Sequence, residues 1–148
     1  MPTSDLHTTI NTFFDSYRSA FERQDAAAIA DHFAYPGLVT SDAGEIVLVP
    51  ITNRAEWIGK LEQLLGMYRA IGVATAHVLE LTLTEISPRL AQAHIHWALH
   101  TAAGERLYDF EASYTVAQIA DEFHIVAIAH NEMPHYQACY ARLKAQRA

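Results

Sequence analysis

His130 and the two residues after it form the first group in this sequence that could carry out chemistry. His130 ends an apolar run and is followed by Asn131 and Glu132. Imidazole is suited to proton transfer near neutral pH, because its ordinary pKa is about 6.5. His130 is therefore a candidate general acid or base. The alternative is a histidine that only forms a hydrogen bond at the end of a strand.

A second group of titratable residues alternates with apolar residues, and alternation would place its side chains on one polar sheet face. Imidazole and carboxylate groups can bind metal ions, but alternation alone produces such a grouping, and we expect no metal site. We expect instead a homodimer contact through His94, His96 and Glu111, which weakens near pH 5. Histidine and carboxylate pairs would then cross the interface. The whole group is Glu80, His94, His96, His100, Asp109 and Glu111.

Helical periodicity predicts three helices in the first half of the chain. Apolar residues recur every three or four positions between residues 6 and 21. Asp25 can cap a second, short helix that runs through Phe33. Asn53 can cap a third helix, whose apolar stripe extends to residue 71.

Alternating apolar and polar residues replace the helical period after residue 73 and predict four successive antiparallel strands. Short turns would pair Trp97 with Phe110 and Leu81 with Ile95, so that apolar side chains meet on one face. The last strand is apolar on both faces and is expected to be central. The remaining elements are that last strand at 122–130, two short strands at 38–40 and 45–51, and a closing helix that begins at Pro134.

These elements predict one α+β domain over residues 1–148. It is expected to be a cone-shaped, curved antiparallel sheet of about six strands, covered by the three helices of the N-terminal half, with a fourth helix at the C-terminus. The aromatic face of the sheet would line a pocket for a small apolar molecule. The residues expected to bind that ligand are Phe14, Phe33, Trp57, Trp97, Phe110, Tyr114 and Asn131.

The segment FFDSYRSAFERQDAAAIADHF, together with the order of the elements, resembles the nuclear transport factor two-like superfamily. That superfamily includes SnoaL-like polyketide cyclases and ketosteroid isomerases. The resemblance implies a cone whose mouth lies between the helices and the sheet, with His130 pointing inward. It implies no single reaction, because members include isomerases, dehydratases, cyclases and proteins without catalysis.

Further candidate residues follow from the same resemblance. Tyr17 lies eight residues before Asp25, a spacing similar to that of the oxyanion-binding tyrosine in ketosteroid isomerases. The alternative is a core tyrosine with its hydroxyl at the pocket wall. Asp42 is one position away from the place of the isomerase base, and is otherwise a turn residue. Ala112 stands where the partner acid would be, so we exclude ketosteroid isomerisation itself.

Composition excludes several classes of function. The 148 residues carry a formal net charge of −7 with no basic stripe, so we expect neither nucleic acid nor an anionic membrane as a partner. The apolar runs are too short to span a bilayer, and no secretory signal is recognised. Cys139 is the only cysteine, which favours a cytoplasmic location. No nucleotide or phosphate-binding motif is present, so no cofactor is expected.

The sequence therefore predicts a protein that holds a small hydrophobic molecule. If it is an enzyme, it is expected to be a cofactor-independent isomerase, dehydratase or cyclase that transfers protons through Tyr17, Asp42 and His130. The alternative is a non-catalytic ligand-binding or dimerisation module. The residues alone leave the choice between the two open.

Overall fold

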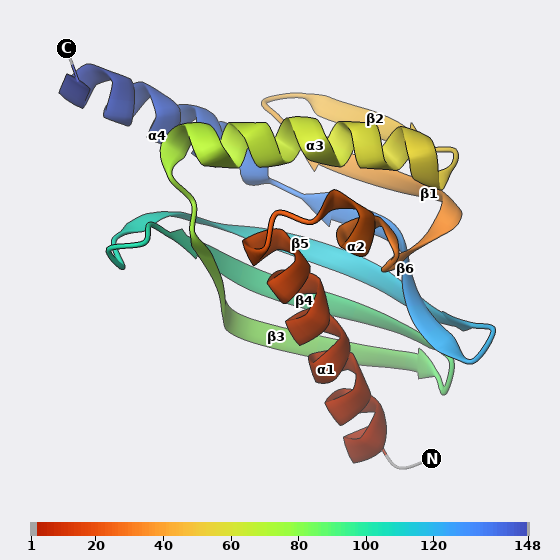
Figure 1. The fold of residues 1–148 in the computed structure, drawn as a ribbon. Coiled ribbons are helices and arrows are strands. Elements are labelled where there is room, and N and C mark those ends of the chain that lie inside the picture. The colour runs from red at the N-terminus through yellow and green to blue at the C-terminus, as the bar shows by residue number, and fades with distance from the viewer. Residues whose placement is uncertain (1–2, 148) are drawn as a thin grey trace.

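Helices and one sheet make up residues 3–147, the part of the chain that the structure, a computed structural model, describes (Figure 1). In this view α1 crosses in front of β3, β4 and β5, and α3 lies in front of β1 and β2. The helices are α1 (Thr3–Glu22), α2 (Ala26–Ala30), α3 (Arg54–Ile71) and α4 (Glu132–Arg147). The strands are β1 (Phe33–Asp42), β2 (Ile46–Ile51), β3 (Thr75–Ser87), β4 (Leu90–His100), β5 (Arg106–Ile119) and β6 (Glu122–His130).

The six strands form one sheet in the order β2-β1-β6-β5-β4-β3. The predicted α+β fold is confirmed, and β6 is central, between β1 and β5. The sheet differs from the prediction in one respect: β1 pairs with β6 in parallel, while all other pairings are antiparallel. The sheet is thus mixed rather than wholly antiparallel. The reason is that β1, in the first hairpin, pairs with the last strand, β6, and not with β3, the strand that follows the hairpin in sequence.

The register of the central hairpins follows the predicted faces. Trp97 pairs with Phe110 and Leu81 pairs with Ile95, so the buried side chains share the face that the helices cover. Simple alternation from Leu81 would place Leu79 on the same face, but the register shifts between Val78 and Glu80, and Leu79 is 43% exposed. A bulge at this position explains the difference, because one extra residue changes the side to which a side chain points.

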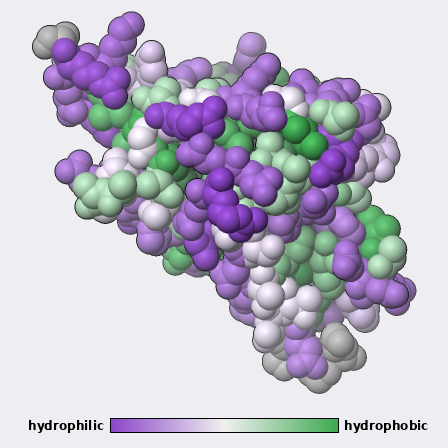
Figure 2. All heavy atoms as spheres, viewed as in Figure 1, coloured by the Kyte–Doolittle hydropathy of each residue, from purple (hydrophilic) through white to green (hydrophobic). Residues whose placement is uncertain are grey.

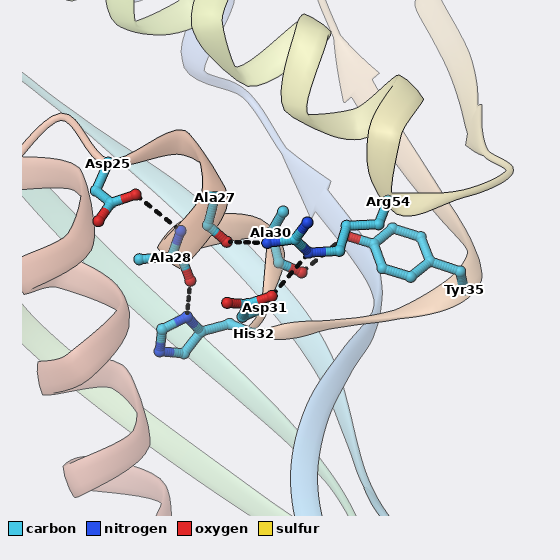
Figure 3. Close-up of polar contacts among 8 residues, drawn as sticks. All are labelled: Asp25, Ala27, Ala28, Ala30, Asp31, His32, Tyr35 and Arg54. Carbon is cyan, nitrogen blue, oxygen red and sulfur yellow. Dashed lines mark hydrogen bonds and ion pairs between the residues drawn. The ribbon is translucent and has the colours of Figure 1, made fainter.

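The short helix α2 ends earlier than the sequence pattern indicates, and Phe33 begins β1 instead of completing the helix. Asp25 caps its first turn by accepting a hydrogen bond from the backbone of Ala28, 3.0 Å away. Tyr35 and Arg54 donate hydrogen bonds to backbone carbonyls of the same helix (Figure 3). Because these side chains satisfy helix carbonyls, the chain can leave α2 and enter the sheet.

The helix α3 is bounded by the residues that the sequence pattern predicts. The side chain of Asn53 accepts a hydrogen bond from the backbone of Glu56, 2.9 Å away, and Gly72 ends the helix at φ 80°. Such a left-handed cap favours glycine. The face of α3 seen in Figure 2 is mainly hydrophilic. Leu61 and Leu65, which also belong to α3, are buried. This arrangement fixes α3 over the sheet and leaves a space beneath it.

Candidate functional site

A cavity of about 110 Å³ lies between α1, α3 and the inner face of the sheet. Because a closed apolar cavity of about 150 Å³ holds benzene, this one suits a compound with roughly one ring. Most of its lining is apolar, and its polar groups come from a few side chains. The lining includes Tyr17, Val39, Trp57, Leu61, Tyr68, Trp97, Phe110, Tyr114, His130 and Glu132.

Six of the ten predicted site residues lie at this cavity, and they come from three parts of the fold. Tyr17 is on α1 and Trp57 is on α3, while the remaining four are on β4, β5 and β6. Those four are Trp97, Phe110, Tyr114 and His130. The inward direction of His130 follows from its pairing with Ala112, which is buried on the same sheet face.

The other four predicted residues do not line the cavity. Phe14 and Phe33 are buried in the core beside it. Asp42 is exposed at the end of β1, where Oδ1 accepts a hydrogen bond from the backbone of Gly44, 3.1 Å away. This is the turn role that the sequence left as the alternative. Oδ1 of Asn131 accepts a hydrogen bond from the backbone N–H of Glu111 over 2.9 Å, so this side chain has a structural role.

Glu132 is the functional group that the sequence reasoning did not assign. It is the first residue of α4 and is only 5% exposed. Tyr68 and Tyr108 both donate hydrogen bonds to its Oε2 atom, at 2.5 and 2.8 Å. Burial raises the pKa of Glu132 to about 7, against the lowering effect of these two hydrogen bonds. Near neutral pH this carboxyl can therefore both accept and give a proton.

One oxygen of Glu132 is left for a ligand. Both tyrosines bind Oε2, and within residues 3–147 no hydrogen bond to Oε1 is present. The backbone N–H of Glu132 donates to Nδ1 of His130 over 3.1 Å. The neutral imidazole must then carry its proton on Nε2. Because burial lowers the pKa of His130, this neutral form predominates at pH 7 and offers an N–H donor.

Tyr114 forms a second polar group in the cavity, together with Trp97 and Tyr17. Nε1 of Trp97 donates to the Tyr114 hydroxyl oxygen over 2.9 Å, and the rings of Tyr17 and Tyr114 are 5.9 Å apart. Burial raises the pKa of Tyr114, while the interactions with Trp97 and Tyr17 lower it. Tyr114 is thus a neutral phenol whose oxygen already accepts a hydrogen bond, and its own proton remains available as a donor.

A sequence signal for Glu132 does exist in hindsight. A carboxylate two residues after His130, at the end of a strand that is apolar on both faces, lies where burial is expected. Tyr68 and Tyr108 have no such signal, because they come from a helix and a strand far apart in the sequence. Only the fold brings their hydroxyls to one oxygen atom.

On the outer sheet face, histidines pair with carboxylates of the neighbouring strand in the same chain. Nε2 of His94 is 2.9 Å from Glu111, and Nε2 of His96 is 2.6 Å from Asp109. These pairs were expected to cross a dimer interface, whereas here each pair forms between β4 and β5 of the same chain. Within the described part of the chain, no group of three or more His, Cys, Asp or Glu residues is arranged to bind a metal ion.

None of the helices within residues 3–147 has both the length and the hydrophobicity that crossing a membrane requires.

Comparison with known proteins places the fold in a well-populated group. A search of curated proteins gives no match. Among solved structures, an NTF-2 like protein of unknown function from Shewanella oneidensis is 15% identical, with 88% of this chain and 99% of that chain covered and a TM-score of 0.67. A domain of unknown function with a cystatin-like fold from Nostoc punctiforme is 16% identical, with 99% and 93% covered and a TM-score of 0.68.

A third similar structure is that of a protein of unknown function from Mycobacterium tuberculosis, at 14% identity, with 95% of this chain and 98% of that chain covered and a TM-score of 0.70. At such identities the likeness shows a shared fold and leaves the reaction open. The sequence profile described as NTF2-like protein (DUF6841) matches residues 5–133. Because that match spans most of the chain, the protein belongs to this NTF2-like family.

Proposed function

We propose that this protein binds a small, largely apolar carbonyl compound and moves a proton on it, with Glu132 as the general acid and base. The observation that supports this most is the buried Glu132 carboxyl, which lines the cavity and has a pKa of about 7. A catalytic acid or base works best when its pKa is close to the working pH. The apolar lining around it suits a substrate without charge.

In the proposed step, Oε1 of Glu132 removes a proton from the carbon next to the substrate carbonyl. The electron pair of that C–H bond forms a carbon–carbon double bond, and the carbonyl pair moves to oxygen. The O–H of Tyr114 and the Nε2–H of His130 are the donors for this oxyanion. In a substrate with a β,γ carbon–carbon double bond, the oxygen pair then re-forms the carbonyl, and the pair of the former double bond takes the proton from Glu132 at the γ carbon. The double bond is shifted, no cofactor is consumed, and the carboxylate is restored.

His130 and Tyr17 keep roles in this proposal, but these roles differ from those expected from the sequence. His130 serves as a neutral donor instead of the acid or base, because its Nδ1 atom is occupied by the backbone of Glu132. Tyr17 supports Tyr114 from α1. Asp42 has no part in the step, since it is exposed outside the cavity.

The direct test is the isomerisation of cyclohex-3-en-1-one to its conjugated isomer, which is followed by ultraviolet absorbance. The substitution Glu132→Gln preserves the shape and the tyrosine hydrogen bonds but removes the proton-transfer group. We expect it to lower kcat by at least about 100-fold, the usual contribution of a general base. Glu105→Gln, at an exposed carboxylate outside the cavity, is the matched control.

The second candidate function is binding without chemistry, which the same apolar cavity supports. The two are separated by deuterium exchange next to the carbonyl of cyclohexanone in D₂O, measured by NMR. Binding of cyclohexanone without exchange above the buffer rate would favour the binding module. Exchange that depends on Glu132 would favour the enzyme.

We also propose that the outer sheet face contacts a second copy of the chain. Strand register extends this face from His94 through Ser113 and Ala129 to Thr40 and Leu48. Its β2 end exposes apolar side chains, with Ile46 65% and Leu48 61% exposed. Exposed apolar side chains beside paired polar groups are typical of a protein interface.

The cytoplasm is the proposed location. Cys139 is buried and forms no disulfide, which is compatible with a reducing compartment.

A further inference from the structure

The polar side chains that line the cavity include an interior group and a second group that is open to solvent. Tyr114 and Glu132, in the interior, are 4% and 5% exposed. The side chains of Arg18 and Glu22 are 30% and 26% exposed, and Gln24 is also exposed. Because a ligand has to enter where the lining meets solvent, Arg18, Glu22 and Gln24 form the rim of the cavity.

The rim offers hydrogen-bond donors, while its acceptors are already in use. Oε1 of Glu22 accepts from Nη1 of Arg18 over 3.0 Å, and Oε2 accepts from the backbone N–H of Ala76 over 2.9 Å. Oε1 of Gln24 accepts from Nη1 of Arg69 over 3.0 Å. Within residues 3–147, the other N–H groups of Arg18 and the amide N–H₂ of Gln24 make no hydrogen bond. A ligand group at the rim must therefore be an acceptor.

The rim and the reacting groups are in contact with the same turns of α1. Tyr17 is the residue before Arg18, and its ring is 5.9 Å from that of Tyr114. Phe21 follows Arg18 by three residues, and its ring is 6.2 Å from that of Tyr68, a hydrogen-bond partner of the buried carboxyl. A compound with one ring in the interior therefore needs only a short arm to reach the rim.

Resting on the proposed function, we propose that the substrate is a small keto acid, whose carboxylate stays at the rim and accepts hydrogen bonds from Arg18 and Gln24. Guanidinium and carboxylate groups form charge-assisted hydrogen bonds, which are stronger than those between neutral groups. Because the rim is open to solvent, the carboxylate keeps part of its hydration, and only the uncharged ketone part enters the apolar interior. Arg18 is then the residue that selects acids over uncharged ketones.

Two acids test this inference, 4-oxocyclohexanecarboxylate and (4-oxocyclohexyl)acetate, whose arms differ by one methylene group. The primary amide of each acid has a similar shape without the charge. Affinities are measured by ligand-observed NMR at neutral pH. We expect at least one acid to bind the unmodified chain about tenfold more tightly than its amide, a modest effect for a charged pair because Arg18 is partly exposed. If neither acid binds more tightly than its amide, the inference is wrong.

The substitution Arg18→Met removes the guanidinium group and keeps a long, unbranched side chain. It should abolish the advantage of the acid over its amide and leave the affinity for the amide unchanged. Lys60→Met removes the same charge from an exposed position of α3 outside the cavity, and should leave the advantage intact. An Arg18→Met chain that keeps the full advantage, or that also binds the amide more weakly, would refute the inference. An equal loss in Lys60→Met would refute it too, because the cause would then be net charge.

A measurement on the interior separates this inference from the proposed function. Deuterium exchange next to the ketone of the tighter-binding acid should fall by at least about 100-fold in Glu132→Gln. Full exchange in Glu132→Gln, together with an acid advantage that depends on Arg18, would refute the proposed function alone. Exchange that depends on Glu132, together with equal affinities for acid and amide, would refute the keto acid inference alone.

Discussion

The hydroxyl of Tyr68 donates to Oε2 of Glu132 over 2.5 Å, so a side chain near the end of α3 binds the first residue of α4. This contact stabilises the ionised form of a carboxyl that burial would otherwise hold protonated. Tyr68 is therefore the side chain through which the pKa of Glu132 can be changed without altering the carboxyl itself.

The substitution Tyr68→Phe should raise the pKa of Glu132 above its value of about 7. Loss of one hydrogen bond to a charged group corresponds to an increase of roughly one pKa unit. A titration of the Glu132 side-chain carbon by ¹³C NMR measures the change. Tyr140→Phe serves as the control, and an unchanged or lower pKa in Tyr68→Phe would contradict the assigned contact.

Glu132 should also make the stability of the protein depend on pH. Its pKa is about 7 in the folded chain against 4.5 ordinarily, so the folded state binds the proton more tightly. The stabilisation is fully present below pH 4.5 and is lost as pH rises through about 7, a change of about 3 kcal/mol. The Glu132→Gln side chain does not titrate, so the Glu132→Gln chain should not lose this stabilisation. As the pH rises, its free energy of unfolding should therefore increase by this amount relative to that of the unmodified chain.

Urea unfolding of both chains at several pH values between 4.5 and 8 measures that difference, and other titrating groups cancel in the comparison. A difference that stays constant over this range would mean that Glu132 is ionised in the folded state at all these pH values.

The helix cap at Asn53 gives a prediction for stability alone. Asn53→Ala removes the side-chain acceptor for the backbone of Glu56 and should lower the free energy of unfolding by about 1 kcal/mol. Thr52→Ala, one position earlier and exposed, is the control in the same urea measurement. Equal stability of the two variants would show that this cap contributes nothing.

The proposed dimer predicts a change in sedimentation. Leu48→Glu places a charge in the exposed apolar part of the outer face and should convert a dimer into monomers, while Tyr140→Glu on α4 should not. An unmodified chain that sediments as a monomer at pH 8 would rule out this interface.

Sequence periodicity predicted the elements and much of the sheet register. Trp97 pairs with Phe110 as expected, because a short turn and matching apolar faces allow only one alignment. The parallel pairing of β1 with β6 has no local signal, since neither turn length nor alternation reports on strands distant in sequence. Leu79 was misplaced because a bulge has no reliable signature in residue type.

The candidate site was predictable only in part. Alternation placed Trp97, Phe110 and Tyr114 at the inner face, and all three line the cavity. Asp42 was chosen by its position relative to a family pattern, which does not distinguish a pocket residue from one in a turn. Glu132 could not be assigned from the sequence, because its surroundings come from α3 and β5, whose Tyr68 and Tyr108 side chains meet at the start of α4.

The parallel pairing of β1 with β6 also determines when the core of this protein can form during synthesis. Val39 lies opposite Ile128, and both strands face the helices, so the first hairpin has no central neighbour until the last strand has left the ribosome. Contacts between such distant segments form late, because long loops must close first. A growing chain that stops before residue 122 therefore lacks the strand that pairs with β1 in parallel and places it in the centre of the sheet.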